Sequence, residues 1–114
     1  MTYERFDVVR VPFPFSDRDA TKNRPALVLS SNDVFNAKTG HSVLAMITSV
    51  KNDAWALDCR ILDLDDAGLP VASAVRFKLF TLDHRLIRAT LGHLSARDQR
   101  TVNVALKTLL VAGD

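Results

Sequence analysis

The residues best suited to chemistry lie in one polar segment between two apolar runs near the N-terminus. Residues 8–30 read VVRVPFPFSDRDATKNRPALVLS, and the polar middle contains Asp17, Lys22, Asn23 and Arg24. This middle is too polar for a core, and functional groups are often carried by loops that a rigid sheet holds in water. Arg24 begins the second apolar run, where the planar fork of a guanidinium can grip a phosphate. The segment therefore predicts an anion-binding arginine at the start of a strand.

The composition is that of an ordinary globular domain. The chain has 114 residues, of which 47% are hydrophobic and 25% charged, and we expect a single domain over residues 1–114. The net charge of +2 permits a polyanionic partner without requiring one. A chain of this length buries only about two thirds of its unfolded surface. We therefore expect a homodimer, which would extend the core.

The sequence predicts a cytoplasmic protein with no metal and no cofactor. The single cysteine, Cys59, cannot form an internal disulfide, and there is no N-terminal apolar leader. Apolar runs stay far below the ~20 residues of a membrane span, so we expect no contact with membranes. Neither the histidines nor the acidic turn at 63–70 has metal-ligand spacing. The side chains concerned are those of His41, His84, His93, Asp63, Asp65 and Asp66.

Several short apolar segments would position these groups. Their length and alternation predict strands at residues 6–13, 25–30, 42–50, 55–62, 73–82 and 86–91. Pro12 and Pro14 should end regular pairing in the first strand, since neither can donate a ladder hydrogen bond. A short helical turn is expected near residues 34–36 after a run of capping residues.

A C-terminal helix should follow these strands. Ser95 is its expected N-cap, with Asp98 completing an acidic variant of the capping box. An apolar stripe then runs along one face of the helix. Short strands followed by one helix predict a mainly β fold with minor α, a small barrel or sandwich. The stripe consists of Val102, Ala105, Leu106, Leu109 and Leu110.

The RPALVLS block at 24–30, preceded by the V-x-V-x-F strand at 9–13, resembles the MazF/PemK family of toxins from toxin–antitoxin pairs. Weaker matches continue through the chain in the same order. The resemblance implies a compact SH3-like barrel of about five to seven strands with a C-terminal helix, like CcdB and MazF. The weaker matches are FNAKTG at 35–40, MITS at 46–49, residues 68–73, TLD at 81–83 and LGHLS at 91–95.

The resemblance also implies an activity, the cleavage of single-stranded RNA without a metal ion. In that reaction the ribose 2′-hydroxyl attacks the adjacent phosphorus, giving a 2′,3′-cyclic phosphate and a 5′-hydroxyl. Arg24 and Thr48 match the catalytic Arg and Thr of the family by position. Arg24 suits stabilisation of phosphoryl charge, because its fork matches two phosphate oxygens. Thr48 would hydrogen-bond a phosphate oxygen or orient the 2′-hydroxyl.

Other residues should contact the RNA. The barrel would bring cations from separate loops to one groove, forming a track for the phosphate backbone. Trp55 and Phe13 could stack on bases, but core or dimer packing is the expectation for both, with Phe15 the more exposed ring. A cognate, partly disordered antitoxin would cover the groove. The expected RNA-binding residues are Phe15, Asp17, Lys22, Asn23, Ser49, Lys51, Arg76 and Lys78, with Lys22, Arg24, Lys51 and Arg76 close together.

One departure from the family pattern leaves alternatives open. Many members carry Asp-Gln-x-Arg where this chain has Phe77, Lys78, Leu79 and Phe80. Arg76 or Lys78 could replace the lost positive charge, and Asp17 is the only replacement for the lost acid. The alternatives are a CcdB-like toxin that binds a protein target such as gyrase, and a degenerate member that binds only its antitoxin.

Overall fold

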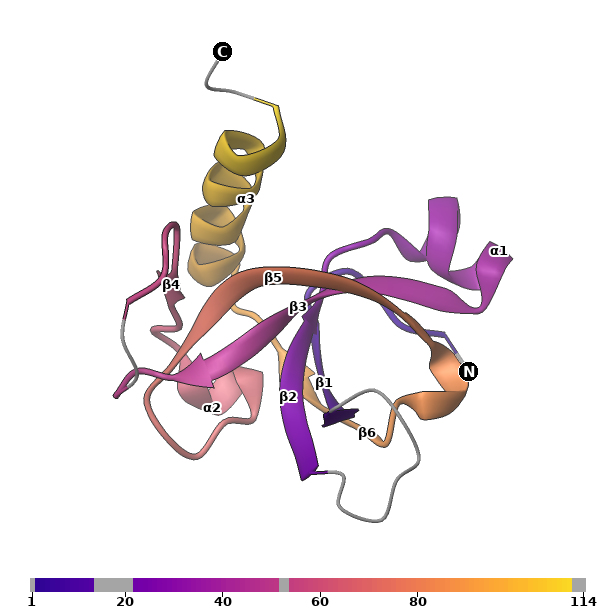
Figure 1. The fold of residues 1–114 in the computed structure, drawn as a ribbon, viewed down its shortest axis with the longest axis horizontal. Coiled ribbons are helices and arrows are strands. Elements are labelled where there is room, and N and C mark those ends of the chain that lie inside the picture. Colours follow the sequence, from indigo (N-terminus) through magenta and orange to yellow (C-terminus); the bar gives the residue numbers. More distant parts are fainter. Residues whose placement is uncertain (1, 14–21, 52–53, 112–114) are drawn as a thin grey trace.

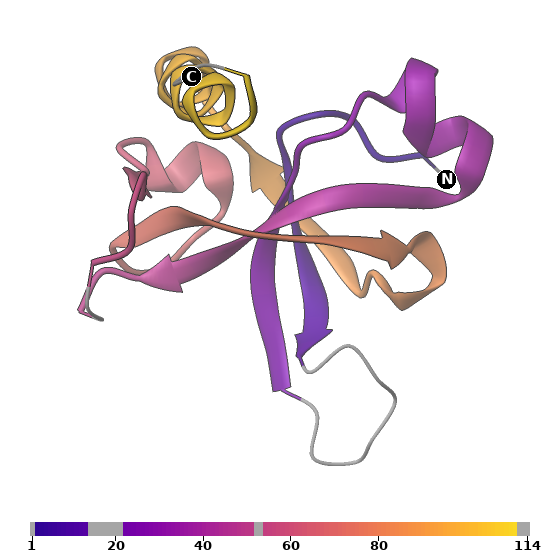
Figure 2. The same ribbon diagram turned by 45° about the horizontal axis from the view of Figure 1, so that its top comes forward.

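The computed structural model describes residues 2–13, 22–51 and 54–111 and shows one curled antiparallel sheet (Figures 1 and 2). Its six strands are in the order β4-β5-β3-β2-β1-β6 and form an open half-barrel. The predicted mainly β fold with a C-terminal helix is confirmed. The strands are β1 (Asp7–Phe13), β2 (Lys22–Val28), β3 (His41–Ser49), β4 (Cys59–Arg60), β5 (Ser73–Asp83) and β6 (Ala89–His93).

Helical segments connect the strands and close one side of the sheet. Ser31 caps the first turn by accepting from the Val34 amide, as the polar run at 30–33 predicts. The last element, α3, packs its N-terminal half on the sheet, and its C-terminal half projects past it (Figure 1). The helical segments are η1 (Asn32–Asn36), α1 (Ala37–Thr39), α2 (Leu64–Ala67), η2 (His84–Leu86) and α3 (Ala96–Leu110).

The alternation of side chains along the strands divides the core into two clusters, one on each face of the sheet. In β2, Leu27 joins the cluster beneath α3, whereas Ala26 and Val28 join the cluster on the opposite face. In β3, Ala45 and Leu44 divide in the same way. The site described below lies on the face of the second cluster, because its residues occupy the same alternate positions along the strands as that cluster does.

A two-residue bulge interrupts the pairing of β3 with β5. Met46 pairs with Arg76, but Ala45 pairs with Leu79, so Phe77 and Lys78 have no partners in β3. Because β5 has two extra residues here, an even number, its side chains continue to alternate between the two faces of the sheet. Phe77 stays in the buried cluster beneath α3, and Lys78 shares with Arg76 the lining of a pocket on the other face. Bulges commonly occur beside functional sites because they re-aim side chains.

The predicted strand at 55–62 is largely wrong. Only Cys59 and Arg60 pair with β5, and the residues before them form a turn. Leu57 has a φ of 68° there, a left-handed conformation that breaks an extended chain. The Asp58 carboxylate accepts from the Trp55 amide at 3.0 Å and so supports the turn.

Other boundaries also differ from expectation. Pro12 remains paired with Asn23 in β2. On its other side β1 has no partner strand at this residue, because β6 pairs with β1 only at Asp7–Arg10. Proline, which has no backbone N–H to donate, is tolerated at such a position. The predicted strand at 86–91 lies instead at Ala89–His93. The acidic segment at 63–70 contains α2. Gly68, which follows the last residue of this helix, has a φ of 72° and lies so close to β6 that a Cβ would collide with the Leu91 carbonyl.

The start of α3 is fixed by Ser95, which caps the Asp98 amide as predicted. The Asp98 carboxylate does not complete the capping box; it is 2% exposed and accepts from the amides of Leu62 and Asp63 at 3.0 Å. It therefore fastens the helix to the segment after β4. At the other end, Leu110 is 65% exposed. Within the described residues, no helix has the length and apolar character needed to span a membrane.

Candidate functional site

Arg24 and Thr48 line the same pocket, on the face of the sheet opposite α3. The register of β2 with β3 pairs Ala26 with Met46, and its continuation by two residues sets Arg24 opposite Thr48. The pocket has a volume of about 170 Å³. Two residues that were predicted from separate parts of the sequence thus meet at one place. The other lining residues are Phe13, Met46, Ile47, Arg76 and Lys78.

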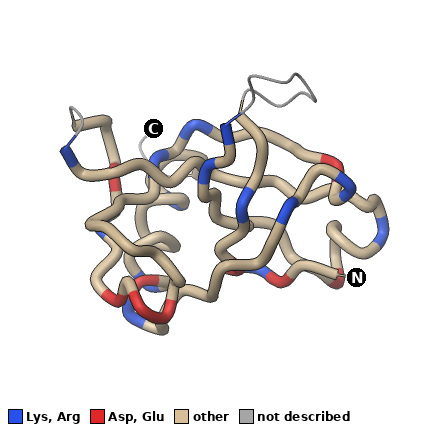
Figure 3. Tube along the Cα trace, turned by 90° about the horizontal axis from the view of Figure 1, so that it is seen from below, with Lys and Arg blue, Asp and Glu red and all other residues tan. Residues whose placement is uncertain are grey.

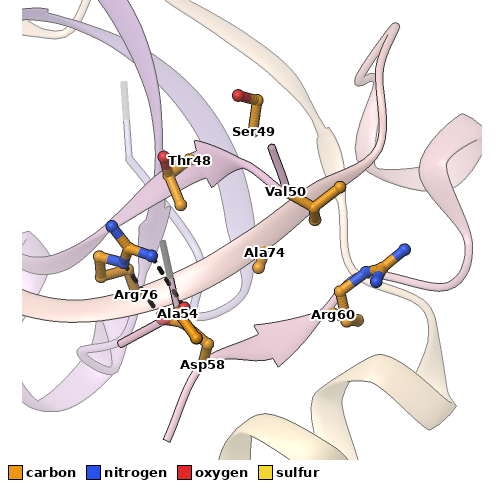
Figure 4. A pocket seen from close by; sticks show the side chains of 8 residues that line it. All are labelled: Thr48, Ser49, Val50, Ala54, Asp58, Arg60, Ala74 and Arg76. Atoms are coloured by element: carbon orange, nitrogen blue, oxygen red, sulfur yellow. Dashed lines mark hydrogen bonds and ion pairs between the residues drawn. The ribbon is translucent and has the colours of Figure 1, made fainter. Parts of the chain in front are cut away.

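A second pocket, of about 260 Å³, adjoins the first. Thr48 and Arg76 line both, so the two form one continuous depression, called the cleft below. Figure 4 shows the second pocket, with the Arg60 guanidinium directed away from Arg76. Its remaining lining residues are Ser49, Val50, Ala54, Asp58, Arg60 and Ala74.

Positive charge dominates the cleft. Arg24, Arg76 and Lys78 line the first pocket, and Arg60 lies in the second. In the view of Figure 3, Lys and Arg positions gather over the middle of the sheet, while most Asp and Glu positions lie towards its edges. Within the described part of the chain, no carboxylate pairs with Arg24. The cleft therefore presents cations to an anionic ligand.

Asp58 is the one carboxylate among the described residues that line the cleft. Its two oxygens accept from Arg76 Nε at 3.2 Å and Nη2 at 2.9 Å, as the dashed lines in Figure 4 mark. Burial opposes its ionisation, but the hydrogen bonds from Arg76 and the Trp55 amide prevail and lower the pKa of Asp58 below its ordinary 3.8. Asp58 is thus ionised at neutral pH and holds Arg76 against the cleft wall.

Asp58 was missed from the sequence because a strand was predicted across it. A strand would have given Asp58 no particular relation to the cleft. The available signal was an aspartate three residues after Trp55, a spacing at which the carboxylate can accept from the backbone of a turn. Apolar alternation at Trp55, Leu57 and Cys59 outweighed that signal.

The other predicted RNA-binding residues are placed as follows. Ser49 lines the second pocket, and Lys51 lines a further pocket that shares Ser49 and Val50 with it. Lys22 and Asn23 are exposed at the start of β2 and line neither pocket of the cleft. Of the four cations expected together, Arg24 and Arg76 share one pocket. Phe15 and Asp17 lie outside the described residues.

For two aromatic residues, packing in the core of the chain was the wrong expectation, while packing in a dimer stays a prediction. Phe13 is 41% exposed and Trp55 47% exposed, so neither ring belongs to the core of the chain. The Arg24 guanidinium carbon lies 5.7 Å from the centre of the Phe13 ring. Lys78 Nζ lies 4.7 Å, and the Arg76 guanidinium carbon 5.8 Å, from the centre of the ring of Trp55, which itself lines neither pocket. Each ring thus lies against cations of the cleft.

Of residues 77–80, where the chain departs from the family pattern, Lys78 is the one that adds a charged side chain to the cleft. Phe77 is buried beneath α3, and Phe80 packs against the second core cluster. The two cations that β5 supplies are Arg76 and Lys78, and the bulge sets them on the cleft together. Within the described ranges, no three His, Cys, Asp or Glu side chains converge as metal ligands would.

Comparisons with known structures agree with this fold. A MazE–MazF crystal structure from Deinococcus radiodurans matches with 25% identity and a TM-score of 0.73, covering 99% of both chains. An endoribonuclease in complex with its cognate antitoxin from a mycobacterial species matches with 19% identity and a TM-score of 0.72, covering 98% and 96%. MazF-mt6 from Mycobacterium tuberculosis matches with 19% identity and a TM-score of 0.72, covering 95% and 99%.

No protein with a curated description matches the sequence. A family model does match, over residues 4–110, which is nearly the whole chain and includes every described residue of the cleft. The chain therefore belongs to the PemK-like, MazF-like toxins of type II toxin–antitoxin systems.

Proposed function

We propose that this toxin is a metal-independent endoribonuclease that cleaves single-stranded RNA. The observation that carries the proposal is the convergence of Arg24 and Thr48 on one pocket that also receives Arg76 and Lys78. A phosphodiester in that pocket would meet a guanidinium, a hydroxyl and two further cations. Membership of a toxin family, and a matched structure that is described as an endoribonuclease, support the same chemistry.

The reaction is transesterification by the RNA itself. The 2′-oxygen forms a bond to phosphorus as the bond from phosphorus to the 5′-oxygen breaks; one proton leaves the 2′-hydroxyl and one is delivered to the 5′-oxygen. Arg24 would bind two phosphoryl oxygens and stabilise the charge that develops on them. Thr48 would donate to a phosphoryl oxygen or orient the 2′-hydroxyl. Asp58 is engaged by Arg76, so its role is to hold that cation and not to accept the proton.

The test is incubation of pure protein with a defined RNA, with and without EDTA, followed by mapping of the ends. We expect 2′,3′-cyclic phosphate and 5′-hydroxyl ends in both cases. Arg24→Ala and Thr48→Val should each lower kcat/KM by about 100- to 1000-fold, the usual cost of one preorganised donor. Arg10→Ala and Thr81→Val are matched controls, since both residues are exposed on strands and line neither pocket.

Two results would refute this assignment. A folded Arg24→Ala protein that cuts at the normal rate would remove Arg24 from the chemistry. Intact RNA after incubation with the folded wild type would favour the alternatives, a toxin that binds a protein target or a member that binds only its antitoxin.

We further propose a cognate antitoxin as a partner of the cleft. Two of the matched structures contain MazE with MazF, and another contains an endoribonuclease with its cognate antitoxin. An acidic, partly disordered segment would be attracted to the cations of the cleft as RNA is. Both complexes should weaken as salt rises, because each would displace counterions. A salt-independent Kd would count against a shared cationic surface.

The assembly we propose is a cytoplasmic homodimer of one toxin domain spanning residues 1–114. The support is apolar surface on the projecting half of α3, where Leu110 is 65% exposed and lines, with Leu106, a pocket that Leu29, Val43 and Leu79 also line. An apolar face of this kind is usually covered by a partner. Light scattering should give twice the mass of the 12.6 kDa chain, and Leu110→Asp should favour the monomer.

A further inference from the structure

We propose that Trp55 is a nucleobase-stacking residue, which binds a base of the RNA beside the cleft. The inference rests on the proposed ribonuclease function and adds a substrate contact to it. Trp55 precedes the second pocket's Asp58 by three residues, and its ring lies against two cations that line the cleft, Arg76 and Lys78.

The exposure of the ring requires an explanation. Indole is the largest aromatic side chain, and yet 47% of Trp55 is exposed to solvent while smaller apolar residues fill both core clusters. Leu57, two residues further along the chain, is also exposed, at 37%. A tryptophan held on the surface beside a cationic cleft is therefore placed for a ligand and not for the core.

The turn that carries the ring is fixed on both sides. Asp58 accepts from the Trp55 amide at 3.0 Å, and its own amide donates to the Trp55 carbonyl at 3.1 Å. The same carboxylate accepts twice from Arg76, which belongs to β5. The left-handed Leu57, at a φ of 68°, is held in place by these contacts. Asp58 thus joins the backbone of the turn that carries Trp55 to the Arg76 guanidinium.

A ring of this kind beside cations provides what a single-stranded RNA needs. Every nucleotide offers a flat base and a charged phosphate, and single-strand binders combine aromatic platforms with a basic groove. The Trp55 ring would receive a base, with Arg76 and Lys78 close enough to receive the adjoining phosphates. Phe13 is placed in a similar way beside Arg24, in the first pocket.

The chain allows a direct test, because Trp55 is its only tryptophan. RNA with 2′-O-methyl sugars at every position has no free 2′-hydroxyl and cannot be cut, so binding can be followed without reaction. We expect saturable quenching of the protein's fluorescence by this RNA. Replacing bases one at a time by abasic sites should abolish the quenching at one position only, the position that stacks on the indole.

Variants give a second, independent measurement. In anisotropy with labelled RNA, Trp55→Ala should weaken binding by about 5- to 150-fold, the fold-change expected for one base–aromatic stack. Trp55→Phe should restore most of the affinity, because it retains a flat ring. Leu62→Ala is the matched control, since Leu62 is also an exposed large apolar residue, at 58%, but has no ring that could stack on a base. Thermal melting should show all three variants folded.

The outcomes separate the inference from the proposed function. If RNA is bound and cut but fluorescence does not change, or if Trp55→Ala binds as tightly as wild type, stacking is refuted and the nuclease stands. If the uncuttable RNA quenches Trp55 but natural RNA is never cleaved, the nuclease is refuted and the stacking stands. Quenching by an acidic peptide and not by RNA would make the ring a protein-binding residue and overturn the inference.

Discussion

Breaking the contact between Asp58 and Arg76 should reduce the stability of the fold by a measurable and pH-dependent amount. The two side chains are only 19% and 13% exposed and are joined by two hydrogen bonds. At an effective dielectric constant of about 20 their attraction is about 4 kcal/mol, and loss of hydration offsets a large part of it. Bonds to charged groups contribute about 1.5–3 kcal/mol net. We therefore expect a coupling free energy of about 2 kcal/mol.

The assay is a double-mutant cycle in urea with Asp58→Ala, Arg76→Ala and the double variant. Asp58→Ala also removes the acceptor of the Trp55 amide. That loss occurs in both variants that lack Asp58, so it cancels from the coupling term. Exposed pairs give about 0.2–1 kcal/mol in such cycles. A coupling free energy below about 0.5 kcal/mol would refute the view that Asp58 and Arg76 form a fixed pair in the cleft wall.

Acid provides a check on the sign. The pKa of Asp58 is lower in the folded chain than its ordinary 3.8. A carboxyl of this kind stabilises the fold above its unfolded pKa, and the contribution disappears as the pH falls through the folded pKa. The coupling measured at pH 7 should therefore persist at pH 5 and decline below pH 4. A coupling that is unchanged at pH 2 would contradict the ionic origin.

Three further predictions concern the fold and the cleft. Gly68→Ala should abolish folding or lower the unfolding free energy by several kcal/mol in thermal melts, because a Cβ would strike the Leu91 carbonyl. Gly40→Ala is the control and should cost only about 1–2 kcal/mol, because Gly40 has a similar φ of 69° but no atom within 4 Å of the added Cβ. Asp98→Ala should cost about 2–5 kcal/mol in urea, since two backbone amides lose their acceptor; a loss under 1 kcal/mol would contradict that role. Lys78→Ala should reduce the slope of log Kd for RNA against log salt by about one phosphate contact, and an unchanged slope would remove Lys78 from the RNA track.

The strands that carry the cleft could be predicted because their sequences alternate or run apolar over strand length. Residues 42–50 and 73–82 became β3 and β5 within one residue at each end. The prediction failed where alternation was accidental. Apolar side chains alternate at Trp55, Leu57 and Cys59, but Leu57 has a left-handed conformation that turns the chain. A leucine gives no indication of that conformation in the sequence. Leu86 was assigned to a strand for the same reason, although Asp83 caps a helical turn there.

The candidate site was predictable only in part. Arg24 and Thr48 stood out through motifs, and the register of β2 and β3 explains why they meet. The exposure of Trp55 could not be predicted, because it depends on which face of the sheet α3 covers and on the turn before β4. The pairing of Arg76 with Asp58 was equally hidden, since it joins residues 18 positions apart across that turn.

The two extra residues of β5, Phe77 and Lys78, give this fold a way to vary through evolution. An insertion of one residue in β5 would turn every following side chain to the wrong face, and selection would remove it. An insertion or deletion of two leaves the following side chains on their faces and adds or removes one position on each face, where Phe77 and Lys78 now lie. Lineages could therefore gain or lose a cation of the cleft in one genetic step, together with one apolar side chain beneath α3.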